Sequence, residues 1–94
     1  MKIKVKFYLS SIGLTGERIA VTKEDITLKD FLIQLSNKYN KKMKESFFDF
    51  TGGKLRPGYV VLYNGKHLWD LPNKINTKLN DEDLITIFSA FSGG

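Results

Sequence analysis

The chain has 94 residues, of which 41% are hydrophobic and 27% charged, and 15 Lys and Arg against 10 Asp and Glu give a net charge of +5. This length allows one small domain, and the composition is that of a chain that folds. The absence of cysteine and the presence of one histidine exclude a disulfide framework, a Cys nucleophile and a histidine-based zinc cluster. No apolar run is long enough to span a membrane and the N-terminus has no apolar leader, so we expect a cytoplasmic protein.

The N-terminal part of the chain predicts a β-hairpin. Apolar and polar residues alternate strictly over residues 2–9, which is the pattern of a half-buried strand. The apolar positions that share one face are Ile3, Val5, Phe7 and Leu9. Residues 10–16 contain two glycines and predict a turn, and residues 17–22 repeat the alternation, with Ile19 and Val21 on one face.

The next segment predicts a helix at about residues 28 to 40. Its apolar residues fall at helical spacing and form one stripe. These residues are Leu28, Phe31, Leu32, Leu35 and Tyr39. Thr27 is a suitable N-cap, because its hydroxyl can accept a hydrogen bond from a free N–H of the first turn.

The C-terminal half predicts three more strands. Residues 41–58 are less regular, with a short helical turn expected near Phe47 and a turn at Pro57-Gly58. The apolar run 59–63 is typical of a strand covered on both faces or nearly so. Asn64-Gly65 predicts a tight hairpin turn into a return strand at 66–69. Residues 70–80 read as a loop, and residues 84–88 as the last strand.

The order of these elements predicts a two-layer α+β fold. The helix can bury its apolar stripe only by lying across one face of the sheet. The first and last strands are the most apolar, so we expect them side by side in the middle. This is the β-grasp, or ubiquitin-like, roll: a mixed sheet of four to five strands with one main helix packed across one face. We expect a domain over residues 1–88 and a flexible tail over residues 89–94.

Residues that could perform catalysis are few. The serines Ser10, Ser11, Ser36 and Ser46 have no histidine near them in sequence, and we interpret the single His67, beside Trp69, as a half-exposed strand residue. Asp81-Glu82-Asp83 could act as paired carboxylates or bind a metal, but it lacks the spacing of a calcium loop, so a polar turn is the better interpretation. Gly52-Gly53-Lys54 lacks the rest of a phosphate-binding loop.

The basic residues do not predict direct binding to nucleic acid. Lys2, Lys4 and Lys6 form a stripe on the polar face of the first strand. No aromatic platform accompanies them, and lysines on an outer strand face are a common way to keep a strand soluble. Weak attraction to an acidic partner is the better interpretation.

The chain ends in Gly93-Gly94, directly after the last predicted strand and a short uncharged segment. Glycine has no Cβ, so such an end is thin and flexible enough to enter a narrow channel. An extended segment from residue 89 to residue 94 reaches about 20 Å. The terminal carboxylate could therefore enter the active site of another protein. The alternative is a frayed terminus without a role.

Together, these residues resemble the ubiquitin-like sulfur carriers over nearly the whole chain. Residues 3–8 resemble the opening strand of the small subunit of molybdopterin synthase, and residues 55–64, beginning Leu-Arg-Pro-Gly, resemble the ubiquitin-related modifier that serves tRNA thiolation. Both of these groups end in a diglycine, as does the thiamine-pathway carrier. Both also have a Leu-x-Asp-x-Asp turn where this chain has Leu79, Asp81 and Asp83. The tail lacks the Pro-Pro pair of the molybdopterin subunit and the arginines of ubiquitin, which favours the modifier-like branch.

The resemblance implies a carrier, not an enzyme, with no cofactor bound by the chain itself. An E1-like adenylating enzyme would activate the Gly94 carboxylate with ATP and Mg²⁺, and a sulfur donor protein would supply the sulfur of a thiocarboxylate. The acceptor would be a tRNA thiolation enzyme or the large subunit of molybdopterin synthase. Lysines of target proteins are a further possible acceptor, and conjugation to lysine without sulfur transfer is the alternative function. A plain interaction domain with an incidental diglycine is the third possibility.

The resemblance also implies roles for single residues. Gly94 would carry the acyl group and Gly93 would give clearance in the channel. The tether between strand and diglycine would be Ser89, Ala90, Phe91 and Ser92. If the isoleucines of the last strand point inward, Phe88 points outward. The candidate contacts for partner proteins are Phe88, Phe91, Tyr59 and Val61.

Overall fold

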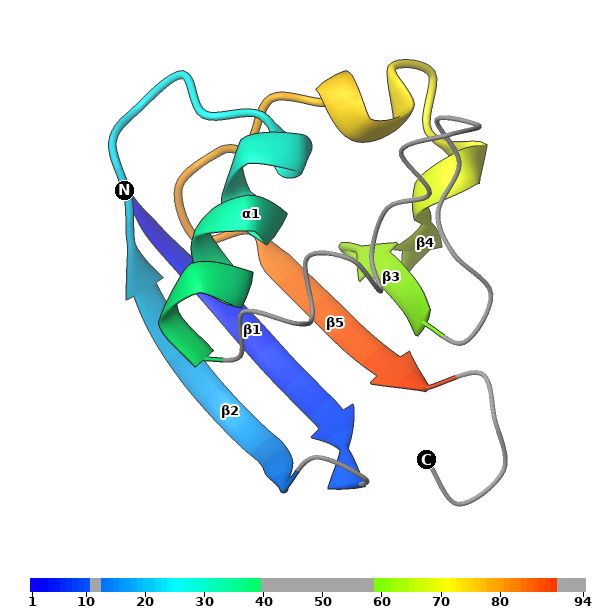
Figure 1. Ribbon diagram of the computed structural model, residues 1–94. Helices are drawn as coiled ribbons and strands as arrows, with labels where there is room; N and C mark the ends of the chain where they lie inside the picture. Colours follow the sequence, from blue (N-terminus) through cyan, green and yellow to red (C-terminus); the bar gives the residue numbers. More distant parts are fainter. Residues whose placement is uncertain (11–12, 40–58, 90–94) are drawn as a thin grey trace.

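The computed structural model describes residues 1–10, 13–39 and 59–89, and in them a helix packs on a sheet (Figure 1). The strands are β1 (Lys2–Leu9), β2 (Leu14–Val21), β3 (Tyr59–Tyr63), β4 (Lys66–His67) and β5 (Leu84–Ser89). The helix is α1 (Leu28–Tyr39), and two short 3-10 helices are η2 (Leu68–Asp70) and η3 (Lys74–Asn76). Among the described residues, no helix has the length and apolar content needed to cross a bilayer.

The strands form one mixed sheet in the order β2-β1-β5-β3-β4. β1 pairs antiparallel with β2 and parallel with β5, and β3 pairs antiparallel with both β5 and β4. The first and last strands therefore lie side by side in the middle, as the sequence predicted. The topology confirms the β-grasp roll.

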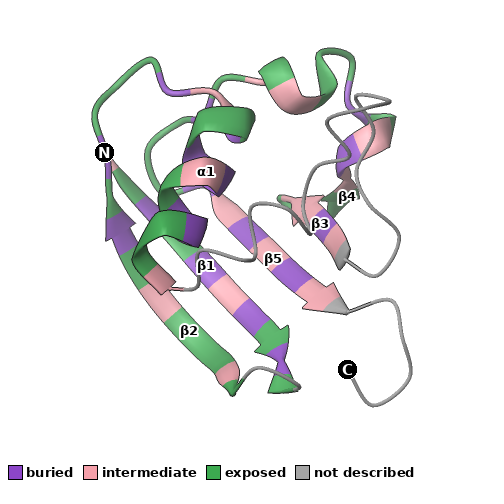
Figure 2. Ribbon diagram, viewed as in Figure 1, coloured by how far each residue is buried: buried purple, intermediate pink, exposed green. Residues whose placement is uncertain are grey.

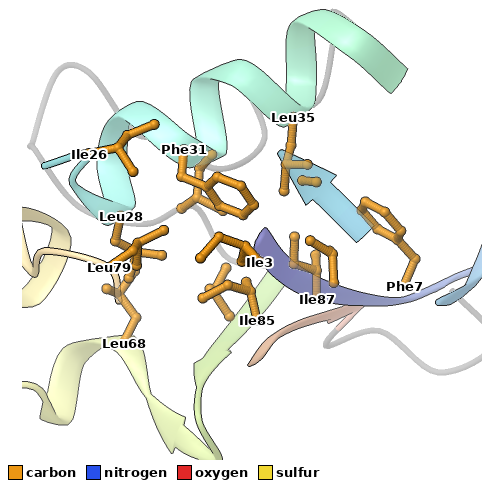
Figure 3. Packing of buried hydrophobic residues seen from close by; sticks show 14 of the residues in the cluster. Ile3, Phe7, Ile26, Leu28, Phe31, Leu35, Leu68, Leu79, Ile85 and Ile87 are labelled. Carbon is orange, nitrogen blue, oxygen red and sulfur yellow. The ribbon is translucent and has the colours of Figure 1, made fainter. Parts of the chain in front are cut away.

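Helix α1 crosses one face of the sheet, and the core lies between them (Figure 3). The whole predicted stripe except Tyr39 is buried, and Tyr39 packs edge-on against Phe7 with a centroid distance of 5.3 Å. The predicted N-cap is present, because the Thr27 hydroxyl accepts a hydrogen bond of 3.2 Å from the backbone N–H of Asp30. The inward residues of β1 are fully buried, as their alternation predicted.

Two apolar side chains of β2, Ile19 and Val21, point away from the core. Ile19 and Val21 share a face, as predicted, but they are 51% and 72% exposed, whereas Ala20 is buried. The reason is the register, in which Ala20 pairs with the buried Ile3 and therefore shares its face. Figure 2 shows the regular recurrence of buried positions along β1 and the mostly exposed β2.

The connections are close to the predicted ones, except that β2 begins at Leu14, inside the turn predicted for residues 10–16. Asn64 and Gly65 have φ values of 49° and 87°, which fits a type I′ hairpin turn, and the Gly65 conformation is one that side chains rarely adopt. The return strand β4 is shorter than predicted, because residues 68–70 turn into η2. The expected loop 70–80 contains η3. The predictions for residues 41–58 lie outside the described residues.

Candidate functional site

The last strand presents Phe88 on the outer face of the sheet. Ile85 and Ile87 are fully buried, and Phe88, one position further, is partly exposed. Phe88 pairs with Tyr8 of β1 on one side and with Val60 of β3 on the other. Paired residues of adjacent strands share a face, so these three side chains form a row across the outer face. The predicted outward orientation of Phe88 is confirmed.

The neighbouring row continues this surface. Leu62 pairs with Thr86, and Thr86 pairs with Lys6, all on the same outer face. Leu62 and Thr86 are partly exposed, while Tyr8 is 57% exposed. We call Tyr8, Val60, Leu62 and Phe88 the β5 patch. It is an apolar surface with a lysine at its margin, and its chemistry suits the docking of another protein.

Val61 is a wrong candidate for this surface. It pairs with Ile87 and is fully buried, so it belongs to the core. The apolar run 59–63 gave no alternation from which to choose the outward positions, and the pairing with β5 makes them Val60 and Leu62. Tyr59 pairs with Ser89 through the backbone, and the side chains of both lie outside the described residues.

The start of β5 is fixed by the carboxylate of Asp83. Its side chain accepts hydrogen bonds from the Tyr63 hydroxyl at 2.6 Å, the Asn64 side-chain amide at 3.0 Å and the backbone N–H of Asn80 at 2.7 Å. Asn64 in turn accepts a hydrogen bond of 2.8 Å from the N–H of Leu84. These contacts fasten the β3–β4 turn to the first residue of β5. The sequence alone did not show them, because the partners lie about 20 positions apart.

In the acidic turn of residues 81–83, the side chains of Asp81 and Asp83 accept hydrogen bonds that hold the fold together. Asp83 is 8% exposed and surrounded by donors, and Asp81 accepts a hydrogen bond of 2.7 Å from the N–H of Lys2. Burial, together with the hydrogen bond to Asp83 and its negative charge, raises the pKa of Tyr63 to about 12. Within residues 1–10, 13–39 and 59–89, no group of three or more His, Asp or Glu side chains could hold a metal ion.

His67 has a structural contact. It is half-buried, as predicted, and its Nδ1 accepts a hydrogen bond of 3.1 Å from the backbone N–H of Trp69. This bond caps η2, so the ring holds the end of the return strand against the following turn.

The tail residues with the most specific predictions are outside the described residues. These are Ala90, Phe91, Ser92, Gly93 and Gly94. What the structure does place is the strand that precedes them in the sequence: β5 is one of the inner strands of the sheet (Figure 1) and carries Phe88 of the β5 patch. Three residues of that patch, Tyr8, Val60 and Leu62, were not among the sequence candidates. Tyr8 could have been found from its outward position in the alternation of β1.

Comparison with known proteins gives the family. The profile of the family described as Urm1 (Ubiquitin related modifier) matches residues 5–94. The ubiquitin-related modifier 1 homolog 2 of Arabidopsis thaliana is 35% identical over 90 residues, which are 96% of this chain and 83% of the relative.

Solved structures agree with this assignment. The solution structure of Urm1 from Trypanosoma brucei has a TM-score of 0.70 and 25% identity, with 99% of this chain and 95% of that one covered. The crystal structure of SAMP1 from Haloferax volcanii has a TM-score of 0.73 over 100% of both chains, and at 21% identity it shows the fold alone. The chain belongs to the ubiquitin-related modifier family of ubiquitin-like proteins.

Proposed function

We propose that the chain is a sulfur carrier whose C-terminal Gly94 is activated by an E1-like enzyme and converted to a thiocarboxylate. The observation that carries this proposal is that the family match extends through Gly93-Gly94, to residue 94. The absence of cysteine agrees with it, since the chain has no side-chain thiol on which it could carry sulfur. The sulfur then goes to a tRNA thiolation enzyme or, as the less favoured branch, to the large subunit of molybdopterin synthase.

The activation follows from carboxylate chemistry. A free carboxylate is a poor acyl donor, so the partner enzyme uses ATP and Mg²⁺ to form the acyl-adenylate of Gly94 and releases pyrophosphate. The terminal sulfur of a persulfide on a donor protein attacks the acyl carbon and expels AMP. A second thiol then breaks the S–S bond, is itself oxidised to a disulfide, and leaves the thiocarboxylate on the chain. All side chains that act on these bonds belong to the partners.

The chain's own contribution is recognition and delivery. The β5 patch lies next to the strand from which the tail extends, so an enzyme that docks on Phe88 and its neighbours has the tail within reach. The hydrogen bonds of Asp83 hold the start of the same strand in place. A rigid surface with a thin extension lets one protein be recognised at the patch and react at Gly94.

Mass spectrometry tests the proposal directly. The chain is incubated with the E1-like enzyme of the same organism, ATP, Mg²⁺ and sulfide, and the intact mass is measured. We expect an increase equal to the difference between sulfur and oxygen, located at Gly94 by fragmentation. A matched chain that lacks Gly93-Gly94 should show no change. An unchanged mass of the intact chain, with an enzyme that activates another carrier under the same conditions, contradicts the proposal.

Conjugation to lysine is the second function, and the word modifier in the family's name favours it. The amine of a target lysine attacks the same activated acyl group and forms an isopeptide bond. Both functions use one activation step, so loss of Gly94 should abolish both. Conjugates in cell extracts without any thiocarboxylate would identify the chain as a modifier alone.

A further inference from the structure

The turn between β3 and β4 contains an Asn-Gly pair, Asn64-Gly65, which has a chemistry of its own. In such a pair the backbone nitrogen of the glycine can attack the side-chain carbonyl carbon, Cγ, of the asparagine. Glycine favours this attack because it has no Cβ to shield its nitrogen. Asn64 is the one asparagine of the chain that precedes a glycine, so it is the residue most prone to deamidation.

Three hydrogen bonds hold Asn64 against the start of β5. Its backbone N–H donates to the carbonyl of Leu84 at 2.8 Å, and its Oδ1 accepts a hydrogen bond of 2.8 Å from the N–H of Leu84. Its Nδ2 donates to Oδ1 of Asp83 at 3.0 Å. Both polar atoms of the Asn64 side chain are therefore engaged, and Cγ cannot turn toward the nitrogen of Gly65 unless these contacts break.

Hydrogen bonding, and not burial, restrains this turn. Asn64 and Gly65 are both exposed, so water and base can reach the peptide group between them. Asp83, in contrast, is 8% exposed, and its Oδ2 accepts hydrogen bonds from the Tyr63 hydroxyl and the N–H of Asn80. The carboxylate that restrains the Asn64 amide is thus itself fixed, and the restraint lasts while this group of contacts stays closed.

We propose that Asn64 is a deamidation site that the fold keeps unreactive, and that it reacts when its contacts with Asp83 and Leu84 open. The Gly65 nitrogen then loses its proton to solvent base and attacks Cγ. The bond from Cγ to Nδ2 breaks, ammonia leaves and a succinimide ring forms. Water opens the ring at either carbonyl, which leaves an aspartate at this position or an isoaspartate, whose main chain runs through the former side-chain carbon.

Either product disturbs the junction of β3, β4 and β5. The aspartate carries a negative oxygen where the Asn64 amide donated to Oδ1 of Asp83, and the two carboxylates repel each other because Asp83 is almost fully buried. The isoaspartate adds a main-chain carbon to a two-residue turn, which then no longer fits the pairing of Tyr63 with Lys66. Deamidation should therefore loosen the start of β5.

Peptide mapping measures the reaction. The chain is kept at mildly alkaline pH, either folded or in guanidinium chloride, and is digested with trypsin at intervals. The peptide of residues 55–66 contains Asn64 and no other asparagine, and its mass reports the replacement of NH2 by OH. Asn64 should react at least about tenfold more slowly in the folded chain than in denaturant, because the open state is rarely populated. In denaturant it should react faster than Asn73 and Asn76.

Hydrogen exchange predicts the ratio of the two rates without any variant. The N–H groups of Asn64 and Leu84 both take part in the restraining contacts, so their exchange gives the fraction of time for which these contacts are open. The rate in the folded chain should equal the rate in denaturant multiplied by this fraction. Asp83→Ala should raise the rate in the folded chain several-fold, whereas Asp81→Ala, which removes a contact with Lys2, should not.

The variant Asn64→Asp represents one product and tests the consequence for the fold. It should unfold at a lower urea concentration than the wild type, and the Leu84 amide should exchange faster. Asn73→Asp is the matched control, since it makes the same change of charge at an exposed residue whose side chain makes no capping hydrogen bond. This control should have neither effect.

Three results would overturn the inference. Equal rates of Asn64 deamidation in folded and denatured chains would show that the contacts give no protection. A rate in denaturant no faster than that of Asn73 or Asn76 would remove Asn64 as the preferred site. An unchanged urea midpoint for Asn64→Asp would remove the consequence for the fold. None of these measurements uses an activating enzyme or the diglycine, so they are independent of the carrier function.

Discussion

The Tyr63 hydroxyl donates a hydrogen bond of 2.6 Å to Oδ2 of Asp83, and this contact joins the end of β3 to the residue before β5. Tyr63 is half-buried and Asp83 almost fully so. A hydrogen bond to a buried carboxylate stabilises the fold more than one between neutral groups. Because β5 leads into the tail, this contact also supports the strand from which the tail extends.

Tyr63→Phe should lower the free energy of unfolding by about 2 kcal/mol near neutral pH, because it removes a hydrogen bond to a charged group. The raised pKa of Tyr63 adds a pH dependence with a defined sign. A group whose pKa is higher in the folded state stabilises it fully below the unfolded pKa of 10.0, and this stabilisation is lost as the pH rises toward about 12.

Urea unfolding of both proteins from pH 7 to pH 11.5 measures this effect. The stability difference between wild type and Tyr63→Phe should be constant up to about pH 10 and narrow above it. Tyr8→Phe is the matched control, since Tyr8 is exposed and should show no difference at any pH. A difference for Tyr63→Phe that stays constant to the highest pH would contradict the assignment.

The two carboxylates of the acidic turn should differ in their effect on stability. Asp83→Ala leaves the Tyr63 hydroxyl, the Asn64 amide and the Asn80 N–H without their acceptor and should cost about 3 kcal/mol. Asp81→Ala removes one exposed hydrogen bond to Lys2 and should cost about 1 kcal/mol or less. Denaturant unfolding of the two variants tests the order, and equal losses would show that the Asp83 contacts carry no special weight.

The sequence predicted the elements of the fold better than their register. Alternation in β1 and helical spacing in α1 identified the buried residues correctly except for the partly buried Tyr39, because each pattern has one apolar face. In β2 the alternation grouped Ile19 with Val21, but both faces carry apolar residues, and only the pairing of Ala20 with Ile3 decides which face is buried. A single strand contains no information about its partner's register.

In the candidate site, too, the sequence predicted the position of some residues and not of others. The outward position of Phe88 could be predicted because the alternating Ile85 and Ile87 show which residues of β5 face the core. The unbroken apolar run of β3 gave no such signal, so it could not show that Val61 faces the core and Val60 the outer face. The contacts of Asp83 with Tyr63 and Asn64 were out of reach for another reason. They depend on how two distant turns pack, and nothing local in the sequence marks that packing.

Variants of two adjacent residues of β5 should differ in whether they affect recognition by the activating enzyme or the stability of the fold. Ile87→Ala creates a cavity in the core and should cost about 3 kcal/mol of stability. Phe88→Ala should cost less, since its side chain is on the partly exposed outer face, but should raise the KM of the E1-like enzyme for the chain about tenfold or more.

Thiocarboxylate formation at several concentrations of the chain, together with urea unfolding, gives both quantities. Val60→Ala and Val61→Ala form a second matched pair, with the outward residue affecting recognition and the buried one affecting stability. An unchanged KM for both Phe88→Ala and Val60→Ala would exclude the β5 patch as the docking surface for the activating enzyme.

The form in which conjugates are detected follows from the position of the last basic residue. Lys78 is the last lysine or arginine of the chain, so trypsin leaves residues 79–94 on a modified target lysine and not a diglycine. A search for diglycine remnants would therefore miss every conjugate of the wild-type chain.

Ser92→Arg introduces a cleavage site directly before Gly93-Gly94, and conjugates of this variant should yield diglycine-modified lysines. Ser92→Arg with Gly94 deleted is the control and should yield none. If the variant still forms a thiocarboxylate but no diglycine-modified lysines are found in cells that express it, the chain transfers sulfur without modifying proteins.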